Sequence, residues 1–162
     1  MKRKFPFYPK SNVKLLPGDF WAIRLNSGNF ACGRVLELPP KSSYGSKTMF
    51  LAGLLDWVGE KIPTFNSIAG AKLIEQGNAH IKTITENDEL ILGNRPLELD
   101  NIEPFICKAV GSGVVYFYKG YSLIEFTPNK PVDQYPNEST WGYEVIKILA
   151  NKYLDKQELD SI

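Results

Sequence analysis

The sequence predicts an α+β fold: a twisted, mainly antiparallel β-sheet built from hairpins, with a short middle helix and a C-terminal helix packed on it. Three observations support this class. Short apolar runs alternate with turn residues, the runs have strand length, and the clearest helical pattern comes at the end of the chain. Strands and helices do not alternate regularly, as they would in a parallel sheet.

The first hairpin has the clearest boundaries. Residues 19–25 alternate along a strand, and residues 30–38 form a second apolar run after the Asn-Ser-Gly turn at 26–28. Pro17 precedes the pair and the two prolines at 39–40 follow it. Because proline cannot donate to a sheet ladder, both positions mark strand ends.

The middle of the chain predicts three further strands and a helix. Residues 48–58 form a long apolar run typical of a strand. Residues 64–76 show an apolar stripe at helical spacing, and Gly77 supplies a C-terminal stop, so we expect a short helix there. Residues 80–85 and 89–92 predict a second hairpin around a polar turn.

The last third predicts one more hairpin and the C-terminal helix. Residues 114–118 and 121–126 are rich in aromatic and β-branched side chains and flank a Lys-Gly turn. Ser139 or Thr140 can cap the helix that follows. The residues expected on its buried face are Trp141, Val145, Ile148 and Leu149.

Composition indicates one cytoplasmic domain over residues 1–162, with residues 1–14 as a basic N-terminal arm. We expect this arm to be solvated, with polyanion binding as the alternative. Nineteen basic and eighteen acidic residues leave a charge of +1, so the overall field favours neither nucleic acid nor membrane. No apolar run approaches the roughly 20 residues that span a bilayer.

The residues available for catalysis or metal binding are few. One histidine and two separated cysteines, Cys32 and Cys107, cannot supply a zinc site, so we expect buried reduced thiols, no metal and no cofactor. A nucleophile would need a cysteine beside His80, which nothing in the sequence arranges. Asp56 and Glu60 could serve a small hydrolase with dispersed carboxylates, but a solvated strand end is favoured.

The tyrosine-rich hairpin offers a different function. Tyr116, Tyr118 and Tyr121 could stack bases of RNA or single-stranded nucleic acid while Lys119 contacts phosphate. The same tyrosines are also ordinary cross-strand pairs, and Glu125 adds opposite charge. We therefore keep nucleic-acid binding as an alternative and do not expect it.

The first hairpin carries a distinctive set of residues: Pro17, Gly18, Asp19, Phe20, Trp21, Ala22, Ile23, Arg24, Leu25, Gly28, Phe30, Gly33, Arg34 and Val35. This set resembles the immunity protein 26 family of bacterial polymorphic toxin systems. Residues 89–98 are similar to a later strand and glycine turn of the family, with Glu89 in place of tryptophan. We expect the glycines to serve turns or close packing, and Asp19 to accept from turn amides.

This resemblance implies an intracellular protein that neutralises a cognate protein toxin by binding it, with no cofactor and no turnover. Such an inhibitor needs aromatic anchors within a polar rim. The aromatic side chains that we expect to contact the partner are Tyr44, Trp57, Tyr116, Tyr118 and Tyr121.

Overall fold

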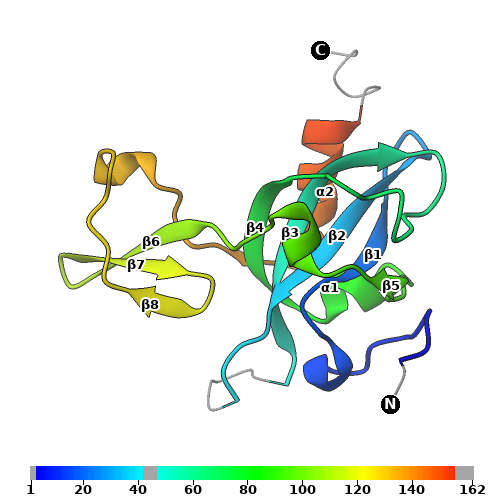
Figure 1. The fold of residues 1–162 in the computed structure, drawn as a ribbon, viewed down its shortest axis with the longest axis horizontal. Coiled ribbons are helices and arrows are strands. Elements are labelled where there is room, and N and C mark those ends of the chain that lie inside the picture. The colour runs from blue at the N-terminus through cyan, green and yellow to red at the C-terminus, as the bar shows by residue number, and fades with distance from the viewer. Residues whose placement is uncertain (1–2, 42–46, 156–162) are drawn as a thin grey trace.

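The computed structural model describes residues 3–41 and 47–155. It consists of a large mixed sheet with helices and a smaller sheet that projects to one side (Figure 1). The predicted α+β class is therefore confirmed. None of the helices in the described part of the chain is long and apolar enough to cross a membrane.

The large sheet has the strand order β5-β1-β2-β3-β4-β9. Neighbouring strands are antiparallel, except that β4 and β9 run parallel. The strands are β1 (Asp19–Arg24), β2 (Phe30–Glu37), β3 (Met49–Gly59), β4 (Leu73–His80), β5 (Gly93–Asn94) and β9 (Thr140–Trp141).

The first hairpin and the third strand form as predicted. In the β1–β2 ladder, Trp21 pairs with Gly33 and Phe20 with Arg34. Gly28 in the connecting turn has a φ of 92°, which favours glycine because a Cβ is strained there. Alternation along β1 sends Trp21 into one hydrophobic core and Phe20 into another on the opposite side of the sheet.

The helix α2 (Val145–Leu154) covers the first of these cores and confirms the C-terminal helix. Its Ile146 and Ala150 are buried, with Val145 and Leu149 packed beside them. Two details of the prediction were wrong. The helix is flanked by Glu144 with no side-chain cap, so Ser139 and Thr140 do not cap it. Trp141 lies in β9, and Ile148 is 63% exposed.

The predicted helix at residues 64–76 was wrong. Reciprocal hydrogen bonds between Thr64 and Ser67 hold turns in this region, and the chain then enters strand β4. The β4 ladder runs along β3 from the pair Met49↔His80 to Leu55↔Leu73. Gly77 is no helix stop, because a Cβ there would lie 2.3 Å from the Trp141 ring. These long-range contacts override the local helical pattern.

The predicted hairpin of residues 80–85 and 89–92 was also wrong. The first part forms the short helix α1 (Lys82–Thr85), which buries Thr83 and Ile84. The second part does not pair with it. Instead, Ile91 bridges to Phe7 and the chain continues into β5 beside β1. Pairing with distant segments therefore decided this region.

The small sheet is the projecting lobe, formed by β6 (Ile106–Gly111), β7 (Val114–Lys119) and β8 (Ser122–Ile124) in that order. The predicted third hairpin is confirmed, although its second strand ends at Ile124. Strand β6 was missed. The Ser-Gly turn at 112–113 joins β6 and β7.

A buried polar network lies where β1 and β2 meet the loops after β5. Asp19 accepts hydrogen bonds from Nη1 and Nη2 of Arg3, at 2.6 and 2.7 Å. It also accepts one from the Leu16 amide, as expected for a carboxylate that binds turn amides. Next to it, Asp100 accepts two hydrogen bonds from Arg95, at 2.8 and 3.0 Å. The fully buried Arg34 places Nη1 4.0 Å from Asp100.

Candidate protein-binding face

The projecting lobe has one packed face and one open face. Cross-strand partners share a face, so Phe117 lies on the same side as Lys108 and Ile124. The loop of residues 125–136 covers part of that side and leaves Val110 and Val115 exposed at its outer end. Phe117 there makes edge contacts with Phe126 and Tyr135, with ring centroids 5.3 and 5.4 Å away. This aromatic cluster is the small hydrophobic core of the lobe.

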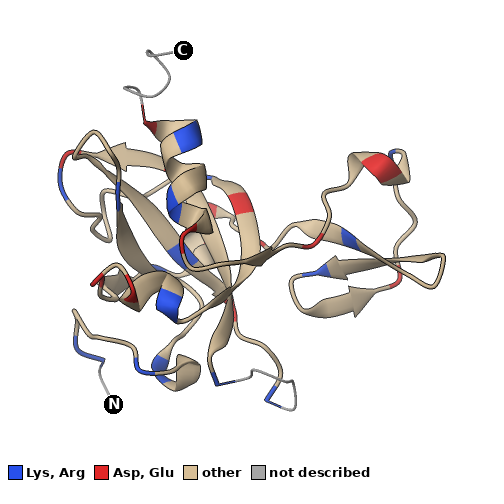
Figure 2. Cartoon of the chain, turned by 180° about the vertical axis from the view of Figure 1, so that it is seen from behind, with Lys and Arg blue, Asp and Glu red and all other residues tan. Residues whose placement is uncertain are grey.

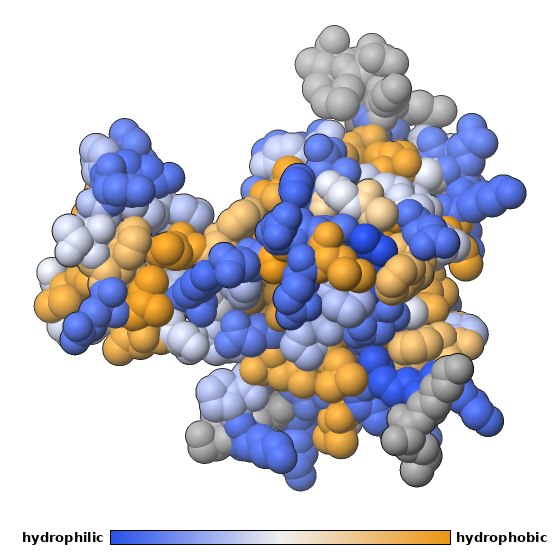
Figure 3. All heavy atoms as spheres, in the orientation of Figure 1, coloured by the Kyte–Doolittle hydropathy of each residue, from blue (hydrophilic) through white to orange (hydrophobic). Residues whose placement is uncertain are grey.

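On the opposite side of the lobe, Cys107 is buried and accepts a hydrogen bond from Gln76 of β4. The remaining side chains there form the open face, which consists of Ala109, Val114, Tyr116, Tyr118 and Leu123. Val114 is 50% exposed, Tyr116 42% and Leu123 60%. None of the five carries a charge, and Figure 3 shows apolar residues gathered on this lobe. Exposed apolar side chains grouped on a paired sheet are typical of an interaction surface.

A depression of about 470 Å³ adjoins the open face. It lies next to the end of the β7–β8 ladder, where the last pair is Phe117↔Ile124 and the two segments of the chain separate. Tyr116 and Leu123 line it together with Glu125. The depression could receive one side chain of a partner, and Glu125 adds a polar rim.

The lobe is fastened to the large sheet at a junction. The Tyr121 hydroxyl donates to Asn78 Oδ1 on β4, and the Tyr121 amide donates to Glu37 Oε1 on β2 at 3.3 Å. Gln76 accepts from the Phe105 amide at 2.6 Å. A polar cavity of about 190 Å³ lies among these groups and Cys107. Burial raises the pKa of Tyr121, so its hydroxyl remains a hydrogen-bond donor.

Glu37 at the junction gives a pH-dependent prediction. Burial raises the pKa of Glu37, so ionisation costs folding free energy as the pH rises through the folded-state pKa. Glu37→Gln keeps an oxygen acceptor and removes the charge. We expect the variant to melt at a higher temperature than the parent protein at pH 7.5. The difference should vanish below about pH 4, where glutamate is protonated in both states.

Thermal melts at the two pH values check this prediction. Glu60→Gln is the matched control, because Glu60 is exposed. A Glu37→Gln protein that melts below the parent at both pH values would contradict it.

The sequence-predicted contact residues fall in different places. Tyr116 and Tyr118 lie together on the open face, and Tyr121 lies at the junction. Trp57 lies near the far end of β3, where its indole donates to the Ser67 carbonyl at 2.9 Å. Tyr44 lies outside the described residues.

Two residues of the open face, Val114 and Leu123, were missed in the sequence. Recognising the hairpin of β6 and β7 would have identified them. Its signal is the mostly apolar run of residues 106–110 just before a Ser-Gly turn. That pattern is itself a hairpin signal. Once β6 is recognised, alternation along β7 and β8 assigns Val114 and Leu123 to the same side as Tyr116.

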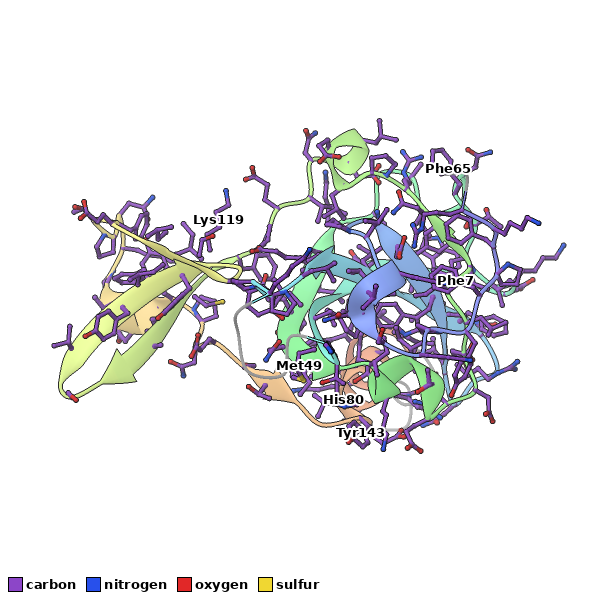
Figure 4. All side chains as sticks on the ribbon, turned by 90° about the horizontal axis from the view of Figure 1, so that it is seen from below. Phe7, Met49, Phe65, His80, Lys119 and Tyr143 are labelled. Carbon is purple, nitrogen blue, oxygen red and sulfur yellow. The ribbon has the colours of Figure 1, made fainter. Side chains whose placement is uncertain are left out.

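The residues considered for catalysis have the following surroundings. Burial raises the pKa of Cys32 to about 12 and also raises that of Cys107, so both are protonated free thiols at neutral pH. His80 Nδ1 accepts from the Lys82 amide at 3.0 Å, and its ring lies beside Tyr143 (Figure 4). Asp56 is exposed on β3 and Glu60 just after it.

Within residues 3–41 and 47–155, no three histidine, cysteine, aspartate or glutamate side chains gather as a metal site would require.

Comparison with known proteins gives one family. The model of the family described as Immunity protein 26 matches residues 16–109. Neither the curated proteins nor the solved structures contain a significant match. The matched segment runs from the start of the first hairpin through most of β6, which is more than half of the chain. The chain therefore belongs to the immunity protein 26 family.

Proposed function

We propose that this protein neutralises a cognate bacterial toxin by binding it directly, and that the open face of the lobe contributes the central contacts. The family membership is the observation that carries the proposal, since an immunity protein acts on a toxin partner. The binding takes place in the bacterial cytoplasm and involves no cofactor and no turnover.

The shape of the lobe supports this choice of surface. The lobe projects from the large sheet (Figure 1), and Val114, Tyr116 and Leu123 of its open face are exposed. Hydrogen-bonded strands and the junction at Tyr121 hold Tyr116 and Tyr118 in place before binding. A pre-ordered aromatic surface loses little conformational entropy on association, which favours tight binding.

Charge placement favours a protein partner over nucleic acid. The alternation of β7 sends Lys119 to the side opposite Tyr118, and Lys119 is paired there with Glu103 at 3.0 Å (Figure 4). Lys108 also lies on the packed face and donates to the Val132 carbonyl. Neither lysine of the lobe's strands therefore lies on the side of Tyr116 and Tyr118, where it could hold phosphates.

The test is to co-purify the tagged protein with the toxin of its own cells and to measure the affinity by calorimetry. We expect a stoichiometric complex with nanomolar affinity, which corresponds to about 12 kcal/mol of binding free energy. The affinity should change little between low and moderate salt if the uncharged open face dominates. Recovery of nucleic acid in place of a protein, with steep salt dependence, would overturn the proposal.

A further inference from the structure

We infer that a groove formed by the N-terminal segment binds an acidic polypeptide segment that also carries an apolar side chain. The groove has a volume of about 720 Å³ and lies on the main body, built by residues that the open face does not use. Its lining, called the N-terminal groove from here on, consists of Arg3, Lys4, Pro6, Phe7, Tyr8, Val13, Lys14 and Leu16.

The frame of the groove is held by specific contacts. The Arg3 guanidinium is fixed by Asp19 and by the Lys14 carbonyl, and it lies 5.0 and 5.4 Å from the ring centroids of Phe5 and Phe7. On the other wall, a short 3₁₀ helix (Asn12–Lys14) is fastened by the Asn12 side chain, which donates to the Met49 carbonyl at 2.7 Å. The groove therefore exists before any partner binds.

The groove exposes apolar side chains on this held frame. Val13 is 74% exposed, Tyr8 54% and Leu16 48%. Scattered exposed apolar residues are ordinary, but these three line one depression together. Covering them with an apolar side chain of a partner would remove that surface from water, which supplies a driving force for binding.

The charge of the groove is one-sided. Its lining contains three cations and no carboxylate, and only Arg3 among them is balanced, by Asp19. Ion pairs among the described residues do not include Lys4, Lys10 or Lys14. Figure 2 shows this N-terminal stretch marked by basic residues without acidic ones between them. A partner with carboxylates complements that charge.

The combination of lysines and exposed apolar side chains in the groove favours a polypeptide over a nucleic acid. A nucleic acid would place phosphates over Val13, Tyr8 and Leu16 and leave this apolar surface without matching contacts. An acidic peptide can present carboxylates to the lysines and an apolar side chain to the depression at once. All of the groove residues except Leu16 precede the segment matched by the family model, so most of the N-terminal groove lies outside that match.

Fluorescence anisotropy with a labelled peptide that repeats Asp-Glu-Leu-Ser tests the inference on the full chain. Three matched probes accompany it: one with lysine at the acidic positions, one with serine at the leucine positions, and an oligo-dT strand. We expect the acidic leucine peptide to bind most tightly. Lys4→Glu with Lys14→Glu should weaken it about tenfold, and Val13→Ser should also weaken it.

Matched controls lie in the exposed loop after β3. Lys61→Glu and Ile62→Ser alter the same residue types on another surface and should leave peptide binding unchanged. Equal binding of the acidic and basic peptides, tighter binding of oligo-dT, or insensitivity to the groove variants would overturn the inference. Because the assay uses no toxin, its result is separate from the test of toxin neutralisation.

Discussion

Replacing Tyr116 and Tyr118 together by alanine should weaken binding of the cognate toxin by about 100-fold or more, which corresponds to about 3 kcal/mol. Both rings lie on the open face, where the truncation removes aromatic surface that a partner could cover. Calorimetry with the purified toxin measures the loss. Survival of cells that express the toxin with each variant gives a second measurement.

The control for this prediction is Tyr153→Ala on α2. Tyr153 is 42% exposed, the same fraction as Tyr116, but it lies away from the lobe. We expect this control to bind the toxin normally. Equal losses in the control and the double variant, or a double variant that binds within threefold of the parent, would remove the open face as the contact surface.

Asp100→Asn should lower the free energy of unfolding by on the order of 3 kcal/mol, because it leaves buried positive charge without its counter-ion. Asp100 is 3% exposed, and its carboxylate faces both Arg95 and the fully buried Arg34. Arg34 Nε and Nη1 have no hydrogen-bond partner among the described residues, so Asp100 is the charge that chiefly compensates them. Urea unfolding measures the difference.

Two further variants separate charge from shape at this network. Asp133→Asn changes an exposed aspartate and should alter stability by less than about 0.5 kcal/mol. Adding Arg34→Met to Asp100→Asn should restore part of the lost stability, because it removes the guanidinium that Asp100 no longer balances. A double variant less stable than Asp100→Asn alone would show that Arg34 contributes packing beyond its charge.

The Asp100→Asn substitution should also change how the free energy of unfolding depends on pH under acidic conditions. The Arg95 hydrogen bonds hold the pKa of Asp100 below its ordinary value. A depressed pKa means that the ionised carboxylate stabilises the fold above pH 4 and that this stability is lost as the pH falls through the folded-state pKa. Asp100→Asn should therefore lose part of the parent's dependence on pH below about 4.

The predicted and observed structures agree for two hairpins in which a short turn joins consecutive strands. The hairpin of β1 and β2 and the hairpin of β7 and β8 both pair neighbouring segments, so turn residues and alternation determine them locally. Strand β6 was missed although it pairs with the neighbouring β7, and the other disagreements arise where the partner is distant in sequence. Strand β4 pairs with β3 across a long loop, and Ile91 bridges to Phe7, so no local pattern specified either partner.

The open face, too, was predictable from the sequence only in part. Tyr116 and Tyr118 were predicted from aromatic residues on a hairpin, and alternation alone places them on one face of it. Whether that face is covered depends on which side the loop of residues 125–136 packs, and the Phe117, Phe126 and Tyr135 cluster decides this. Aromatic residues on both faces look alike in the sequence.

By itself, the sequence determined the α+β class, the local hairpins, the C-terminal helix and the likeness to the immunity protein 26 family. Each of these rests on patterns a few residues long, which turn chemistry and side-chain periodicity set locally. Only the tertiary structure decided the course of residues 64–94, the open face of the lobe and the N-terminal groove. These depend on contacts between segments far apart in the chain, whose packing and hydrogen bonds outweigh weak local preferences.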